Sequence, residues 1–137
     1  MSARLDRERA TVAEHLPANT RHVWTDGRDV WIFTKRTELG IDFTIALYFD
    51  PDQQGYSVQL VSPEIEREWH NPHIGHIFDD GVICLGGTNW KAAPSMLEAY
   101  GKACLWAEGS AVMIRSKELG QPSECPFSAN NMEGEVV

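Results

Sequence analysis

The chain has 137 residues, 42% of them hydrophobic, and a formal net charge of −8. This is the composition of a single soluble globular domain, and the negative charge argues against a nucleic-acid partner because phosphate binding favours a basic surface. The N-terminus lacks the apolar stretch of a signal peptide and no apolar run reaches the length of a membrane span, so we expect a cytoplasmic protein without a membrane partner.

Residues 4–16 are predicted to form an amphipathic helix that ends at Pro17. One side of this helix carries the apolar residues Leu5, Val12 and Leu16. The charged residues that spread over the rest of it are Arg4, Arg7, Glu8 and Arg9. A solvated face is the simplest interpretation of these charges.

Residues 21–61 are predicted to form an antiparallel meander of about four strands. Asp26-Gly27 is a hairpin signal, and residues 50–55 hold the Asp, Pro and Gly of a further turn. Polar and apolar residues alternate over residues 56–61, as a half-buried strand requires. Ser62-Pro63 ends this strand.

Residues 94–119 are predicted to be helical, either as one helix or as two separated by a break near Gly109. Its apolar face would hold Met96, Tyr100, Ala103, Cys104 and Ala107. The order of elements indicates an α+β fold, with a single domain over residues 1–120 and a loosely held tail over 121–137.

Residues 70–85 hold three of the five histidines and one of the three cysteines. A tight turn at Asp79-Asp80-Gly81 leads into an apolar run, Val-Ile-Cys-Leu, which Gly86-Gly87 interrupts. Cys84 would therefore have a defined position at the end of an ordered segment. The cysteines are odd in number and widely spaced, at Cys84, Cys104 and Cys125, so they do not suggest a disulfide framework.

Residues 80–85 (Asp-Gly-Val-Ile-Cys-Leu) resemble the second half of the active-site signature of ubiquitin-conjugating enzymes. That signature reads His-Pro-Asn, a few residues, a Gly, then Ile-Cys-Leu. His76 stands in the position of the family's asparagine, and a scrambled Asn71-Pro72-His73 lies slightly earlier. Trp90 and Pro94 match residues that the family places after its cysteine. The resemblance covers roughly residues 56–107, and its departures suggest a divergent branch of the superfamily, for which we consider a prokaryotic origin.

The resemblance implies an N-terminal helix, a β-meander, a cysteine segment and a C-terminal helix or helices. It also implies that Cys84 accepts a ubiquitin-like protein as a thioester from an activating enzyme and passes it to a lysine of a target protein. His76 or His73 would donate a hydrogen bond to the oxyanion or act as a base, and Asp80 would orient or deprotonate the lysine. The first helix would dock the activating enzyme through Arg4 and Arg7. This chemistry needs no metal and no other cofactor.

Other interpretations stay open from the sequence alone. Cys84 would then be only a buried small hydrophobic residue. A non-catalytic module of the same fold, which binds a ubiquitin-like protein or a partner enzyme, is the first alternative, although such variants lose the cysteine that this chain keeps. A zinc site is the second alternative, with the ligands His70, His73, His76 and Cys84. A cysteine hydrolase is the third, although Gly-Gly-Thr-Asn after Cys84 does not resemble a helix start. The structural interpretation of His76 is a hydrogen bond that holds the loop, and that of Asp79 is a turn residue. Trp90 would be a packing residue, Cys104 would lie in the core, and Cys125 would be exposed.

Overall fold

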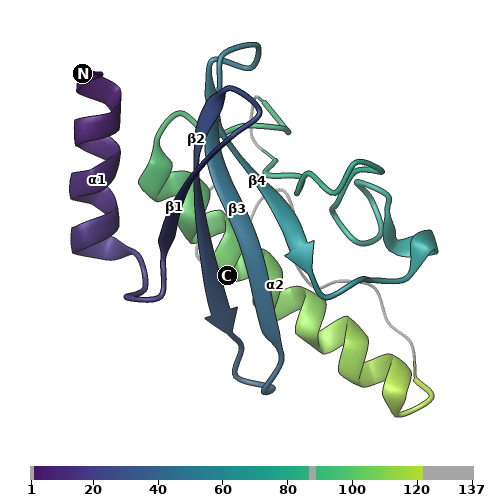
Figure 1. Ribbon diagram of the computed structural model, residues 1–137. Helices are drawn as coiled ribbons and strands as arrows, with labels where there is room; N and C mark the ends of the chain where they lie inside the picture. Colours follow the sequence, from purple (N-terminus) through teal and green to yellow (C-terminus); the bar gives the residue numbers. More distant parts are fainter. Residues whose placement is uncertain (1, 87–88, 122–137) are drawn as a thin grey trace.

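The structure, a computed structural model, describes residues 2–86 and 89–121 (Figure 1). It has an N-terminal helix, a four-stranded antiparallel sheet in the order β1-β2-β3-β4, and a long C-terminal helix. The elements are α1 (Ala3–His15), β1 (Arg21–Thr25), β2 (Arg28–Arg36), β3 (Asp42–Asp50), β4 (Gly55–Ser62), a 3-10 turn (Arg67–Trp69) and α2 (Met96–Glu118). The predicted α+β class and the four-stranded meander are confirmed. The predicted tail and Cys125 lie outside the described residues, apart from Gln121.

Turn chemistry explains where the strands reverse. Asp26 and Gly27 have φ values of 54° and 73°, and both positions of a type I′ hairpin require such left-handed conformations. Thr25 therefore pairs directly with Arg28 across this loop. The C-terminal segment was predicted as one helix or as two helices with a break near Gly109. The structure has one helix, because α2 runs through Gly109 without a break.

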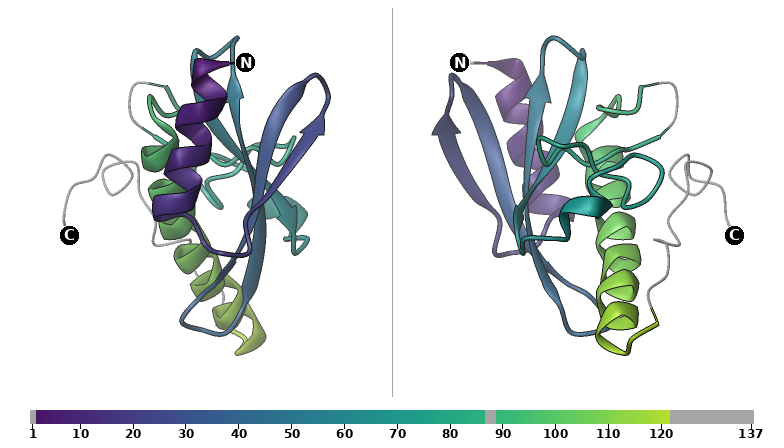
Figure 2. Two further views of the ribbon diagram at one scale, coloured as in Figure 1. Left: turned by 60° about the vertical axis from the view of Figure 1, so that its left-hand side comes forward. Right: turned by 90° about the vertical axis from the view of Figure 1, so that its right-hand side faces the viewer.

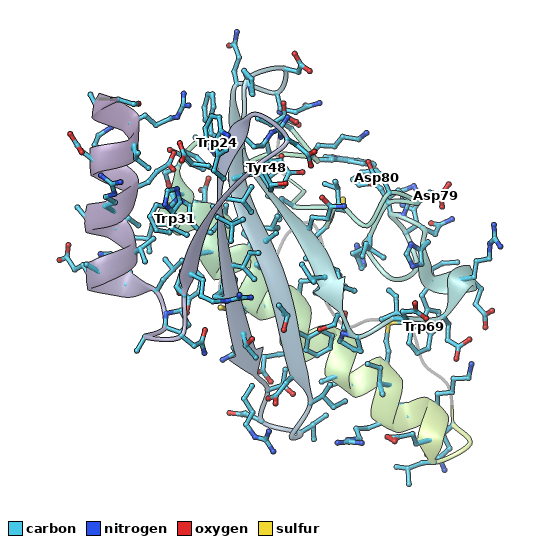
Figure 3. The ribbon with its side chains drawn as sticks, in the orientation of Figure 1. Trp24, Trp31, Tyr48, Trp69, Asp79 and Asp80 are labelled. Carbon is cyan, nitrogen blue, oxygen red and sulfur yellow. The ribbon has the colours of Figure 1, made fainter. Side chains whose placement is uncertain are left out.

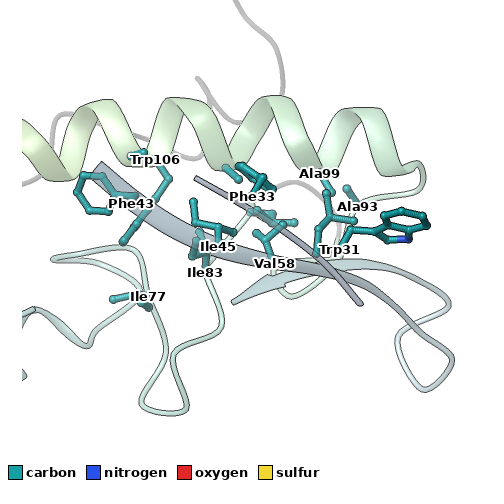
Figure 4. Packing of buried hydrophobic residues seen from close by; sticks show 14 of the residues in the cluster. Trp31, Phe33, Phe43, Ile45, Val58, Ile77, Ile83, Ala93, Ala99 and Trp106 are labelled. Carbon is teal, nitrogen blue, oxygen red and sulfur yellow. The ribbon is translucent and has the colours of Figure 1, made fainter. Parts of the chain in front are cut away.

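Both helices lie against the same face of the sheet (Figure 2). The side chains of this face, among them Phe33, Ile45 and Val58, are almost fully buried. Ala99, Ala103 and Trp106 of α2 complete the cluster (Figure 4). The small alanines let the helix approach the strands closely, and this packing holds the segment between β4 and α2, which carries the candidate site.

The charged residues of α1 were predicted to lie on a solvated face, but for Glu8 this is wrong, because it is only 2% exposed. Its carboxylate accepts a hydrogen bond from Trp31 Nε1 at 2.8 Å and another from the Tyr56 hydroxyl at 2.9 Å, and Arg4 Nε lies 3.4 Å away. Burial and the bond to Glu8 raise the pKa of Tyr56 above that of an ordinary phenol. A buried charge is tolerated when it is paired and hydrogen-bonded, so Glu8 fastens α1 to the sheet.

Within the described residues, no helix combines the length and the apolar character needed to cross a membrane.

Candidate active site

Cys84 lies at one end of a short β-hairpin whose two arms are held by backbone hydrogen bonds. Phe78 N donates to Val82 O at 2.8 Å, Ile77 pairs with Ile83, and Cys84 N donates to His76 O at 2.9 Å. These contacts form a regular antiparallel ladder. His76 and Cys84 are therefore directly opposite each other on neighbouring arms.

The tip of the hairpin is the predicted Asp-Asp-Gly turn. Gly81 N donates to Phe78 O at 3.0 Å, and Gly81 has a φ of 87°. A three-residue hairpin loop ends in such a left-handed position, which glycine adopts with little strain. Asp80 Oδ1 accepts a hydrogen bond from Val82 N at 3.0 Å, which closes the turn.

The second arm also runs beside β4, and this contact sets the direction of each side chain. Ile83 N donates to Val58 O at 2.9 Å, and Leu60 N donates to Gly81 O at 2.9 Å. Ile83 and Leu85 are fully buried. Because side chains alternate along an extended segment, Cys84 faces away from that core. It is 6% exposed, so its sulfur has only a narrow access to solvent.

His76 is held in a left-handed conformation, with a φ of 54°. The loop before it is closed by the carbonyl of Asn71, which accepts the amides of Ile74, Gly75 and His76 at 3.0–3.1 Å. Asn71 Oδ1 also accepts the amide of His73 at 2.7 Å. Asn71 thus fixes the loop that presents both histidines next to the cysteine arm.

Gly75 is a residue of the site that the sequence reasoning did not identify as important. A Cβ atom at this position would lie 2.2 Å from the carbonyl oxygen of Trp69, so the backbone passes too closely for any side chain. Its carbonyl accepts a hydrogen bond from the buried Trp106 Nε1 at 2.9 Å. A glycine between two histidines in a loop is the sequence signal that points to such a close approach.

Trp90 and His73 come from the two loops that flank Cys84. Trp90 O accepts the amide of Leu85 at 2.7 Å, which places Trp90 beside the segment that follows the cysteine. The Trp90 and His73 rings meet edge to face with centroids 5.9 Å apart. Trp90 is 45% exposed, so its ring packs against His73 near the surface. The ring contact joins the two loops on either side of Cys84.

Burial raises the pKa of the Cys84 thiol above that of an ordinary cysteine, and a hydrogen bond from the Gly86 backbone opposes this shift. Desolvation disfavours the charged thiolate, and this is why burial raises the pKa of the thiol. The sulfur is therefore protonated at neutral pH and becomes a nucleophile only when its proton is removed.

Asp79 and Asp80 lie at the tip of the hairpin, in the loop between Phe78 and Val82 (Figure 3). Three residues separate Asp80 from Cys84, and Asp80 belongs to the turn whereas Cys84 lies at the opposite end of the hairpin, across from His76. Asp79 and His70 line a neighbouring cleft of about 670 Å³, whose lining residues do not include Cys84 or His76. The structure thus places His76 opposite the cysteine and joins the loops of His73 and Trp90 on either side of it, and it gives the Asp80 carboxylate a role in the turn.

The remaining predicted residues lie elsewhere. Arg4 packs over the Phe49 ring at 4.4 Å in addition to its ion pair with Glu8, while Arg7 is exposed. Cys104, predicted to lie in the core, is half-buried on α2, and burial raises the pKa of its thiol.

Two further observations bear on the alternatives. Among residues 2–86 and 89–121, no three His, Cys, Asp or Glu side chains are grouped so that they could hold a metal ion. His70 instead contacts the carbonyl oxygen of Phe78 through Nδ1 at 3.2 Å.

Comparisons of the chain with protein-family models, with curated proteins and with solved structures found no match.

Proposed function

We propose that this chain is a conjugating enzyme that carries a ubiquitin-like protein on Cys84 and transfers it to a lysine. The observation that carries the proposal is the fixed pairing of Cys84 with His76 across the hairpin, at 2.9 Å between amide and carbonyl oxygen. His76 is the residue that the resemblance aligns with the family's asparagine. Helix, meander, cysteine segment and helix also follow each other in the order that the resemblance predicts.

The proposed reaction has two acyl-transfer steps. The Cys84 thiolate attacks the thioester carbonyl of the carrier protein, and the sulfur of the activating enzyme leaves as a thiolate. A lysine amine then attacks the new thioester, loses a proton, and expels the Cys84 thiolate. Both substrates are proteins, so the site needs no deep pocket.

His76 or His73 is proposed to donate a hydrogen bond to the oxyanion that forms when the amine attacks. An imidazole offers an N–H in either protonation state. The raised pKa of Cys84 has a consequence for the same step. A more basic thiolate is a poorer leaving group, so the thioester would be stable until an amine is properly positioned.

The activating enzyme is proposed to bind α1 mainly through Arg7. Arg4 is already engaged by Glu8 and by the Phe49 ring, whereas Arg7 is exposed. Removing Arg4 would also disturb the anchor of α1, so Arg7 is the cleaner residue to test for partner binding.

A second candidate function is a non-catalytic module that binds a ubiquitin-like protein. The low exposure of Cys84 favours this alternative, because a purely structural cysteine is also buried. Single-turnover discharge separates the two. The chain is first loaded by the activating enzyme, the carrier and ATP, and free lysine is then added. A conjugating enzyme loads and loses its carrier to lysine, whereas a chain that never loads is a binding module.

A further inference from the structure

Lys91 holds an amine on the face of the hairpin to which the Cys84 side chain points. Phe78 N donates to Val82 O, so these two side chains share one face, and Cys84 shares it by alternation along its arm. The Lys91 Nζ lies over the ring of Phe78, 5.0 Å from the ring centroid. Phe78 is the diagonal cross-strand neighbour of Cys84, a relationship that spans roughly 7–8 Å. The amine therefore lies on the same face as the cysteine and close to it.

The backbone of Lys91 also passes close to Cys84. Leu85 N donates to Trp90 O at 2.7 Å. This hydrogen bond joins the peptide group that follows Cys84 to the peptide group that precedes Lys91. Standard bond lengths then put the Cα atoms of Cys84 and Lys91 no more than about 9 Å apart. The flexible four-carbon stem of lysine can cover this separation, so Nζ can reach an acyl group on the sulfur without movement of the backbone.

Two hydrogen bonds fix the main chain from which the Lys91 side chain starts. Lys91 N donates to Asn89 Oδ1 at 3.0 Å, and Lys91 O accepts a hydrogen bond from the Ser57 hydroxyl at 2.6 Å. Ser57 is buried on β4. The amine thus moves about a fixed origin, which raises its effective concentration at Cys84 above that of a free lysine in solution.

The chain has four lysines, and Lys91 differs from the other three. Lys35 and Lys117 are held in ion pairs, at 3.5 Å and 2.7 Å. Lys102 is half-buried on α2. Lys91 is exposed, and within the part of the chain that the structure describes its ammonium contacts the Phe78 ring and no carboxylate. Its amine is therefore available as a nucleophile once it loses its proton.

We propose that an acyl group carried by Cys84 passes to the Lys91 amine of the same chain, which makes Lys91 a modification site. The amine nitrogen attacks the thioester carbonyl, the C–N bond forms, and the C–S bond breaks. The proton of the amine goes to the departing sulfur, directly or through water. The products are an amide on Lys91 and a free Cys84 thiol. With a ubiquitin-like protein as the acyl group, this inference rests on the function proposed above, whereas the shift itself requires only an acylated Cys84.

Acylation by a small thioester tests the shift on the full chain without a partner protein. The chain is incubated with the acetyl thioester of thiophenol, the reagent is removed, and the peptides of Cys84 and Lys91 are followed by mass spectrometry. We expect an acetyl thioester on Cys84 that decays while an acetyl amide appears on Lys91, at a rate independent of the chain concentration. Hydroxylamine should remove the acetyl group from Cys84 and leave it on Lys91. In Cys84→Ala, Lys91 should receive no more acetyl than Lys102 does.

Lys91→Arg keeps a cation at this position and removes the acceptor amine. We expect its Cys84 thioester to last at least about tenfold longer than that of the unsubstituted chain, because the tethered amine is lost. Lys102→Arg is the matched control and should leave the lifetime unchanged.

The outcomes separate this inference from the proposed function. An acetylated Cys84 beside an unmodified Lys91, or an unchanged thioester lifetime in Lys91→Arg, would overturn the shift and leave Cys84 as the nucleophile. Equal acetylation of Lys91 in Cys84→Ala and in the unsubstituted chain would also overturn it, because the reagent would then modify the lysine directly. No acetyl group on either residue would overturn the shift and would count against the nucleophile as well.

Discussion

The carbonyl oxygen of His76 accepts a hydrogen bond from the backbone amide of Cys84 at 2.9 Å. This contact ties the position of the cysteine to the conformation of the histidine. Because His76 has a φ of 54°, the local chain depends on a residue that tolerates left-handed geometry. Asparagine tolerates it at least as well, which gives a physical reason why the two residue types would be exchanged at this position.

Replacement of His76 should separate its backbone role from its side-chain role. Alanine is disfavoured at positive φ, so His76→Ala should lower the free energy of unfolding by about 0.5–1 kcal/mol, whereas His76→Asn should be nearly neutral. Urea unfolding measures both. Equal stabilities of the two variants would show that the left-handed conformation does not constrain this position.

If the His76 side chain stabilises the oxyanion, His76→Ala should still load but should discharge to lysine about a hundredfold more slowly. His76→Asn should recover part of that rate, and His73→Ala should have a milder effect. Single-turnover discharge from the preloaded chain provides the rates. Discharge at the normal rate by a folded His76→Ala variant would show that the His76 side chain does not stabilise the oxyanion.

Much of this fold is predictable because local patterns and tertiary packing agree. The Asp26-Gly27 hairpin and the Asp80-Gly81 turn follow from residues that accept left-handed conformations. The burial of Glu8 was not predictable from helical periodicity, because its partners, Trp31 and Tyr56, come from distant strands. The location of Asp80 at the far end of the hairpin likewise depends on a strand pairing that sequence spacing does not reveal.

The rate at which Cys84 is alkylated should depend on its burial and on the contact between the Trp90 and His73 rings. Because its pKa is raised, alkylation by iodoacetamide should be slow at neutral pH and should still increase above pH ~8.5, where an ordinary thiol is half ionised. Trp90→Ala should accelerate alkylation several-fold by opening the contact with His73. Mass spectrometry of the Cys84 peptide gives the rate, with Trp24→Ala as a control for loss of an exposed tryptophan. An unchanged rate in Trp90→Ala would show that this ring does not limit access.

Loss of the Glu8 carboxylate should destabilise the chain strongly. Glu8→Ala leaves Trp31 Nε1 and the Tyr56 hydroxyl without their buried acceptor, which should lower the free energy of unfolding by about 2–4 kcal/mol. Glu8→Gln keeps one accepting oxygen and should lose roughly half as much. Glu14→Ala, an exposed position on the same helix, serves as the control in urea unfolding. Equal stabilities of Glu8→Ala and Glu14→Ala would refute the anchoring role.

Two glycines should respond in opposite directions to alanine. Gly75→Ala would force a Cβ against the Trp69 carbonyl and should destabilise the chain by about 1–3 kcal/mol. Gly101→Ala meets open space on α2 and should stabilise it by about 0.5–1 kcal/mol through helix propensity. Thermal unfolding of both variants checks the signs. A stable Gly75→Ala variant would contradict the close approach of the loop that carries His73 and His76.

The most direct measurement of the central claim is the chemistry of the bond at position 84. The chain is incubated with its cognate activating enzyme, the ubiquitin-like protein and ATP, and the products are analysed with and without thiol reductant. We predict an adduct that the reductant removes, no adduct with Cys84→Ala, and with Cys84→Ser a reductant-resistant adduct, because an oxygen ester does not exchange with thiols. Cys104→Ala should behave like the unsubstituted chain. An adduct that persists in Cys84→Ala, or the absence of any adduct on the unsubstituted chain, would contradict the account.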